Sequence, residues 1–137
     1  MFNFQLYEGK KENKKIVSEE GVKTLISSYK YENYILYIDS FYTSPNLCRI
    51  LYNNGVAVIG MTNAKRYRLD KICSNQLEKW ESEYPVNNEI MYLAWKDKKQ
   101  VKILSTVFSK DSIETTTYNK KTKRYDKINK PKLVVSY

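Results

Sequence analysis

The hydrophobic and polar positions at the start of the chain predict one strand followed by one helix. Residues 2–7 alternate between apolar and polar side chains, as in a half-buried strand, and turn residues occupy 8–10. Ser18 precedes two glutamates, which is typical of a helix N-cap with acidic residues in the first turn. We therefore expect an amphipathic helix after Ser18, whose apolar stripe consists of Val22, Leu25, Ile26 and Tyr29.

The pattern of residues 34–60 predicts a strand, a helix and a second strand. The continuous apolar run at 34–38 is typical of a strand buried on both faces, in the middle of a sheet that lies between helices. Ser44 and Pro45 predict the N-cap and first position of a helix. The apolar run at 56–60 predicts the next strand. This alternation indicates an α/β fold, and the inner stripe of its helix consists of Leu47, Ile50 and Leu51.

The remaining sequence predicts mainly β-structure. Residues 90–95 and 101–106 are two apolar strands separated by the charged residues 96–99, so we expect a hairpin. Residues 115–125 form another β-prone stretch, and residues 133–135 predict a short final strand that leads outward. No apolar run is long enough to cross a membrane, and the first residues do not resemble an export signal.

The composition excludes most of the common catalytic groups. The chain contains no histidine, so catalytic Ser-His-Asp and Cys-His arrangements and His-ligated metals are ruled out. The two cysteines, Cys48 and Cys73, cannot complete a four-ligand zinc site, and we expect both to be buried apolar residues. Carboxylate, lysine, arginine, tyrosine and hydroxyl chemistry remains.

Positive charge is concentrated in one part of the chain. The net charge is +9, and residues 96–132 contain twelve basic and four acidic side chains. Such a segment attracts polyanions, among which nucleic acid is the most abundant in a cell. The alternative is a solvated lysine-rich surface, because lysine far outnumbers arginine here. The most clustered candidates for phosphate contact are Lys120, Lys121, Lys123 and Arg124.

Asp39 is the candidate catalytic and metal-binding residue. It follows the apolar run at 34–38, and the carboxyl ends of strands are where α/β sheets place ligand sites. A carboxylate there suits Mg²⁺, which takes oxygen ligands, and two such ions can act on a phosphodiester without histidine. The alternative is that Asp39 is only a turn or cap residue.

Four segments, in order, resemble piggyBac-type transposases. Residues 39–47, DSFYTSPNL, resemble the family's "DN-aromatic-aromatic-TS-x-x-L" motif, and residues 95–106 match its "W-x-D-x-K-x-V-x-x-L-S-T" segment. Residues 6–10 resemble its "Y-x-G-K" turn. Residues 131–137 resemble the run that leads to "Y-N-x-x-x-G-G-V-D".

The resemblance implies a partial RNase H-like catalytic core at 1–61, a β-rich insertion at 62–130 and a return strand at 131–137. It implies three aspartates that bind two Mg²⁺ or Mn²⁺ ions and cut and join DNA at transposon ends. Asp39 corresponds to the second aspartate. The first core strand, with the first aspartate, would precede residue 1, and the third aspartate and C-terminal helices would follow Tyr137. We therefore expect an internal fragment that binds metal weakly or not at all and is inactive by itself.

The sequence departs from the family pattern near the expected site. Ser40 replaces the asparagine after the second aspartate, and the family's "G-T-x-R-x-N-R" segment reads GMTNAKR at 60–66. Lys65 and Arg66 are candidates for phosphate contact, with a solvent-facing role as the alternative. The resemblance further implies DNA as partner and a nuclear location, and dimerisation is possible in intact members of the family. Two alternatives stay open: a non-catalytic nucleic-acid-binding module that uses 96–132, and a reading frame without a stable product.

Overall fold

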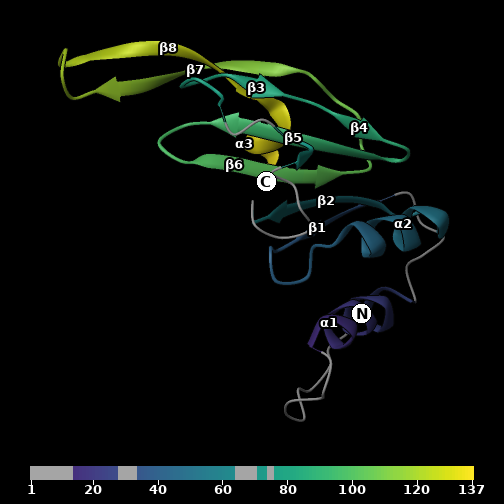
Figure 1. The fold of residues 1–137 in the computed structure, drawn as a ribbon. Coiled ribbons are helices and arrows are strands. Elements are labelled where there is room, and N and C mark those ends of the chain that lie inside the picture. Colours follow the sequence, from purple (N-terminus) through teal and green to yellow (C-terminus); the bar gives the residue numbers. More distant parts are fainter. Residues whose placement is uncertain (1–13, 28–33, 64–70, 74–75) are drawn as a thin grey trace.

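The computed structural model describes residues 14–27, 34–63, 71–73 and 76–137 (Figure 1). The strand predicted at 2–7 lies outside these residues. The described elements are α1 (Lys14–Ile26), β1 (Ile35–Ile38), α2 (Pro45–Asn53), β2 (Ala57–Thr62), β3 (Ser82–Glu83), β4 (Val86–Asn87), β5 (Ile90–Lys96), β6 (Gln100–Ser105), β7 (Ser112–Asn119), β8 (Arg124–Pro131) and α3 (Lys132–Ser136). The α/β class expected from the sequence is confirmed. None of these helices is long and apolar enough to cross a membrane.

A six-stranded mixed sheet organises the described residues. Its strands follow the order β1-β2-β6-β5-β3, and β4 pairs with β5. The β1–β2 pair is parallel, whereas β2 pairs antiparallel to β6 and β6 antiparallel to β5. In the β2–β6 pair, Gly60 lies opposite Leu104. This pair joins the segment expected to be the catalytic core (1–61) and the segment expected to be the insertion (62–130) in one sheet. The hairpin predicted from 90–95 and 101–106 is confirmed as β5–β6.

The sheet is packed on both faces. On one face, α1 and α2 contribute to a cluster that contains Val22 and Leu51 together with Val58, Tyr92 and Leu104 from the strands. The other face carries a smaller cluster of Ile59, Met91, Leu93, Ile103 and Leu133. Alternate residues of one strand serve opposite clusters because strand side chains point to opposite faces. β5 is therefore the strand buried along its length, from Ile90 through Trp95.

The prediction that 34–38 forms a buried central strand is wrong for the described sheet. β1 lies at its edge, and the side chains of Ile35 and Tyr37 are 44% and 46% exposed. Its other face packs, through Leu36 and Ile38, in the cluster to which α1 and α2 contribute. An apolar run of this length does not specify how many faces are covered, because that depends on which elements pack against the strand.

The predicted start of the helix agrees with the structure for α2 but not for α1. For α2 the prediction is confirmed: Pro45 is the first helical residue, and Ser44 has extended N-cap geometry and accepts a hydrogen bond from the Leu47 N–H. For α1 the predicted N-cap is wrong, because the helix starts at Lys14 and Ser18 lies inside it. Residues 14–17 contain no glycine or proline that would prevent an earlier start. Val22 and Ile26 are buried as expected.

The β7–β8 hairpin is a separate two-stranded sheet that extends beyond the end of the main sheet (Figure 1). Its base contacts the main sheet, because the Lys130 ammonium lies 5.4 Å from the ring centre of Trp95. Its tip, residues 120–123, is a turn between the two strands. The β-prone stretch at 115–125 is thus confirmed as β-structure, extended at both ends.

The return strand predicted at the end of the chain is wrong. Residues 132–136 form the short helix α3, which begins directly after Pro131 at the end of β8. The Lys132 N–H donates to the Asp111 carbonyl at 2.8 Å, and Leu133 is buried against the second cluster. The helical turn lets Leu133 and Val134 both pack on the sheet, which overrides the β-propensity of the valines.

Both cysteines are buried, as predicted. Cys48, a residue of α2, is fully buried, and Cys73 is 2% exposed and packs in the same cluster. Burial raises the pKa of Cys48 to about 12 and that of Cys73 to about 11. Their thiols therefore stay protonated and unreactive at neutral pH, consistent with apolar packing roles.

Candidate functional site

Asp39 lies directly after β1, at the carboxyl end of the parallel β1–β2 pair, and its side chain is exposed. One carboxylate oxygen, Oδ1, accepts a hydrogen bond from the Ser40 N–H at 2.7 Å. The Asp39 carbonyl accepts from the N–H groups of Tyr42 and Thr43, both at 3.0 Å, which forms a tight turn. Asp39 does not cap α2, because that role belongs to Ser44. Its carboxylate is thus presented to solvent on a fixed turn.

Thr43 fixes this turn against β2. Its hydroxyl donates to the Asp39 carbonyl at 2.8 Å, and its side chain is fully buried. A Cβ atom on Gly60 would lie 2.5 Å from Thr43 Oγ1 and 2.8 Å from Ile38 Cγ1. Only glycine leaves room at this point, so Gly60 allows the turn that carries Asp39 to lie directly on the neighbouring strand.

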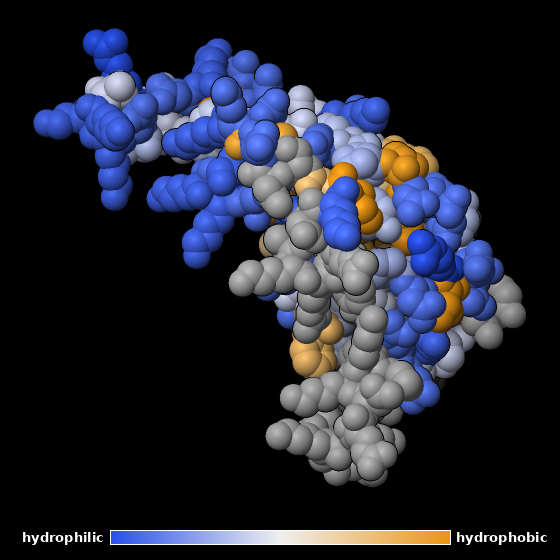
Figure 2. Space-filling view, in the orientation of Figure 1, coloured by the Kyte–Doolittle hydropathy of each residue, from blue (hydrophilic) through white to orange (hydrophobic). Residues whose placement is uncertain are grey.

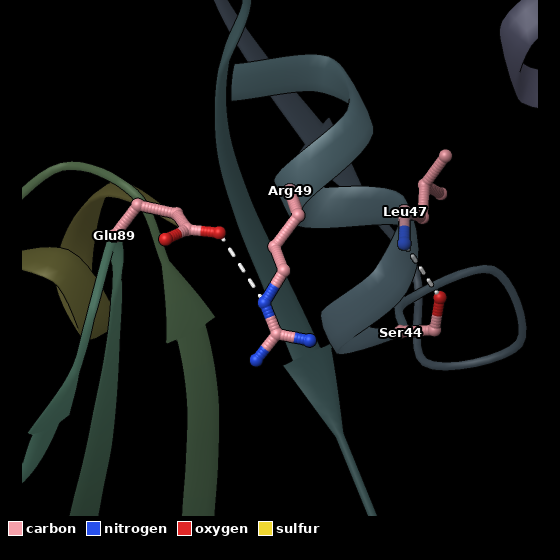
Figure 3. A network of polar contacts seen from close by, with 4 residues as sticks. All are labelled: Ser44, Leu47, Arg49 and Glu89. Carbon is pink, nitrogen blue, oxygen red and sulfur yellow. Dashed lines mark hydrogen bonds and ion pairs between the residues drawn. The ribbon is translucent and has the colours of Figure 1, made fainter. Parts of the chain in front are cut away.

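Glu19 connects α1 to the start of α2. Glu19 is 8% exposed, and its carboxylate accepts hydrogen bonds from the Ser44 hydroxyl and, at 2.9 Å, from the Asn46 side-chain amide. The Ser44 hydroxyl in turn accepts from the Leu47 N–H at 3.0 Å (Figure 3). A carboxylate at a helix N-terminus is also favoured by the helix dipole. Glu19, expected only as an acidic residue in the first turn of its own helix, therefore stabilises the start of the next one.

Arg49 connects α2 to the main sheet through an ion pair. Its Nε atom lies 3.2 Å from a carboxylate oxygen of Glu89, which precedes β5 (Figure 3). Both side chains are partly exposed, so the pair contributes modestly to stability. Together with the Glu19 contacts, it holds α2 from two directions.

The far end of the chain meets β1 beside Asp39. The Tyr137 hydroxyl donates to the Ile38 carbonyl at 2.7 Å, and its ring lies edge-on to that of Tyr37, with centroids 6.3 Å apart. Burial and the nearby negative charge of Asp39 raise the pKa of Tyr137. Residues 98 positions apart in the sequence, Asp39 and Tyr137, therefore lie at the same end of β1.

The Asp39 carboxylate could donate to a divalent cation. It is exposed and is the donor type that Mg²⁺ and Mn²⁺ prefer. Across the described residues, however, no three acidic or cysteine side chains lie close enough to hold a metal ion together. Glu19, the nearest buried acid along the sequence, is already bonded to Ser44 and Asn46. A complete site would need further carboxylates.

The predicted basic residues separate into two groups. Lys65 and Arg66 lie outside the described residues. The other four lie together at the tip of the β7–β8 hairpin: Lys120, Lys121 and Lys123 in the turn, and Arg124 at the start of β8. Figure 2 shows this hairpin, at the upper left, covered mainly by hydrophilic residues. The structure thus gathers these four residues on the β7–β8 hairpin, whereas Asp39 follows β1 of the main sheet.

Three residues around the candidate site were not anticipated as such: Gly60, Glu19 and Tyr137. A glycine at the end of an apolar strand signals close backbone approach, so Gly60 could have been found from the sequence. The partners of Glu19 and Tyr137 are distant in the sequence, and no local signal identifies them.

Comparisons with known proteins agree with this architecture. A family model described as Transposase IS4 matches residues 1–137. Among solved structures, the fold is similar to that of a piggyBac transposase, determined by cryo-EM in a synaptic complex with hairpin DNA, with a TM-score of 0.68. The sequences are 18% identical, and the match covers 95% of this chain and 26% of that one. The chain therefore spans about a quarter of the length of the protein it resembles.

Proposed function

The chain belongs to the transposase family described as Transposase IS4, and from this premise we propose that it forms part of the RNase H-like catalytic core of a piggyBac-type DNA transposase. The observation that carries the proposal is the exposed carboxylate of Asp39 at the carboxyl end of β1, in a fold similar to that of piggyBac transposase. In the motif that residues 39–47 resemble, this aspartate is the second of three metal ligands.

The role of Asp39 is to supply one carboxylate to a site for Mg²⁺ or Mn²⁺. Two bound divalent ions would supply charge stabilisation at the attacking and leaving oxygens of a DNA phosphodiester. The residues of this chain contribute rigidity: Thr43 holds the turn through the Asp39 carbonyl, and Gly60 lets it pack on β2. A ligand held in this way loses little freedom when a metal binds.

The position of Tyr137 supports a site assembled from distant segments. Its hydroxyl bonds to Ile38, the residue before Asp39. In piggyBac-type sequences, the segment that residues 131–137 resemble leads to the third aspartate. Such an aspartate would therefore enter near Asp39.

We expect the 137-residue chain alone to lack DNA-cleaving activity, because one carboxylate holds Mg²⁺ weakly and does not position an attacking water. The measurement is nicking of supercoiled plasmid in Mg²⁺ or Mn²⁺, with Asp39→Asn as the matched control. Wild type and Asp39→Asn should give the same background. Metal-dependent nicking that disappears in Asp39→Asn would contradict the expected inactivity, because these residues would then suffice for catalysis.

A second candidate function is nucleic-acid binding without catalysis, and the basic tip of the β7–β8 hairpin favours it. Within the described part of the chain, no acidic side chain forms an ion pair with Lys120, Lys121, Lys123 or Arg124. Exposed, uncompensated cations bind phosphates with an affinity that falls as salt rises. DNA is the partner that both candidate functions share, and a nuclear location is the expectation that goes with it.

A further inference from the structure

The tip of the β7–β8 hairpin combines cations with an aromatic pair. Tyr118 and Tyr125 lie directly opposite each other in the β7–β8 register, with ring centroids 5.3 Å apart and planes inclined by 61°. Their side chains are 51% and 71% exposed. Two large rings so open to solvent on a projecting hairpin are poorly explained by packing alone, because neither contributes to a core cluster.

The turn beside these rings has a defined conformation. The Asn119 side-chain oxygen accepts from the N–H groups of Lys121 and Thr122, at 3.0 and 3.4 Å. The Asn119 amide donates to Asp126 at 2.8 Å, which ties the two strands together. Lys123 adopts a positive φ of 53° and completes the turn. The basic residues are therefore presented at a fixed place relative to the tyrosines.

The charge of the hairpin points to an anionic partner. Residues 112–132 contain seven basic and two acidic side chains. One acid, Glu114, pairs with Lys127 at 3.1 Å, and the other, Asp126, is bonded to Asn119. The basic side chains at the tip can therefore bind an anionic ligand. A positively charged surface interleaved with exposed aromatic rings is the arrangement that binds backbone phosphates and stacks bases.

From this juxtaposition we propose that the hairpin tip binds single-stranded DNA, with bases stacked on Tyr125 and Tyr118 and phosphates held by Lys120, Lys121, Lys123 and Arg124. The proposal rests on the nucleic-acid-binding function put forward above and narrows its substrate to unpaired strands. In a duplex the bases are already stacked on one another, so only the lysines and arginine would be used. The tyrosines therefore distinguish the two substrates.

Fluorescence anisotropy of the full 137-residue chain with labelled oligo(dT), and with a duplex of equal length, tests the proposal at several salt concentrations. Tyr118→Val/Tyr125→Val removes both rings but keeps β-forming residues, and we expect it to weaken oligo(dT) binding at least tenfold and duplex binding little. Tyr118→Phe/Tyr125→Phe keeps the rings and should retain the affinity. Tyr52→Val, which removes an equally exposed tyrosine from α2, should have no effect.

The basic residues are tested in the same assay. Replacing Lys120, Lys121 and Lys123 by glutamine should weaken the binding of both oligo(dT) and the duplex and reduce the salt dependence of the affinity. The control Lys98→Gln/Lys99→Gln, in the β5–β6 turn, should change either affinity little. Two results with the variants would overturn the proposal: unchanged oligo(dT) affinity in the valine variant, or loss of affinity in the phenylalanine variant. A preference of the wild-type chain for the duplex or for oligo(rU) would overturn it as well. Absence of salt-dependent binding to every oligonucleotide would instead overturn the nucleic-acid-binding function itself.

Discussion

Replacing Gly60 by alanine is expected to lower the free energy of unfolding by about 3 kcal/mol, although alanine is otherwise the better residue in a strand. The added Cβ atom would lie 2.5 Å from Thr43 Oγ1 and 2.8 Å from both Thr43 Cγ2 and Ile38 Cγ1. Thr43 cannot rotate away freely, because it is fully buried and bonded to the Asp39 carbonyl. Urea denaturation followed by circular dichroism measures the change.

A double-mutant cycle assigns this cost to the contact with Thr43. In a Thr43→Ala background, both clashing threonine atoms are absent, so Gly60→Ala should cost about 1–2 kcal/mol less than in wild type. If the two substitutions are additive, or if Gly60→Ala stabilises the protein, then Thr43 does not pack on Gly60, and the turn that carries Asp39 is not fixed in this way.

Replacing Glu19 by alanine should lower the free energy of unfolding by about 2 kcal/mol. The substitution leaves the Ser44 hydroxyl and the Asn46 amide without their acceptor at the buried start of α2, and an unsatisfied buried polar group costs about 1–3 kcal/mol. It also removes a negative charge from the helix N-terminus. The unfolding midpoint in urea, at constant m-value, reports the effect.

Glu20→Ala is the matched control, because Glu20 is the next residue of α1 and its side chain is exposed. Its effect should stay within about 0.5 kcal/mol, as for most surface substitutions. Equal effects of Glu19→Ala and Glu20→Ala would mean that α1 does not dock on α2 through Glu19.

The features that could be predicted from the sequence are those set by neighbouring residues. Ser44 and Pro45 specify the start of α2 because an N-cap hydroxyl and a proline at the first helical position act within one turn. The β5–β6 hairpin is equally local, since two apolar strands flank a short charged turn. The place of Asp39 after a strand is also local, but its role as a metal ligand stays a prediction.

The features that could not be predicted depend on contacts between distant residues. The apolar run of β1 does not reveal that Ile35 and Tyr37 are exposed, because this depends on which elements pack on that face of the strand. Glu19 looks like a local cap, but its partners Ser44 and Asn46 lie on another element. Val134 and Val135 favour a strand, and packing of Leu133 on the sheet makes this segment helical instead.

We propose that Asp39 is a metal ligand at the point where β1 and residues 135–137 meet. The most direct test of this claim is a Mn²⁺ titration of the ¹⁵N-labelled chain, followed by paramagnetic broadening of backbone amide signals in NMR spectra. Broadening should appear together at 38–43 and 135–137, because Tyr137 bonds to Ile38. It should vanish in Asp39→Asn and persist in Asp126→Asn. Broadening at one of these two segments without the other, or broadening that survives in Asp39→Asn, would contradict the claim.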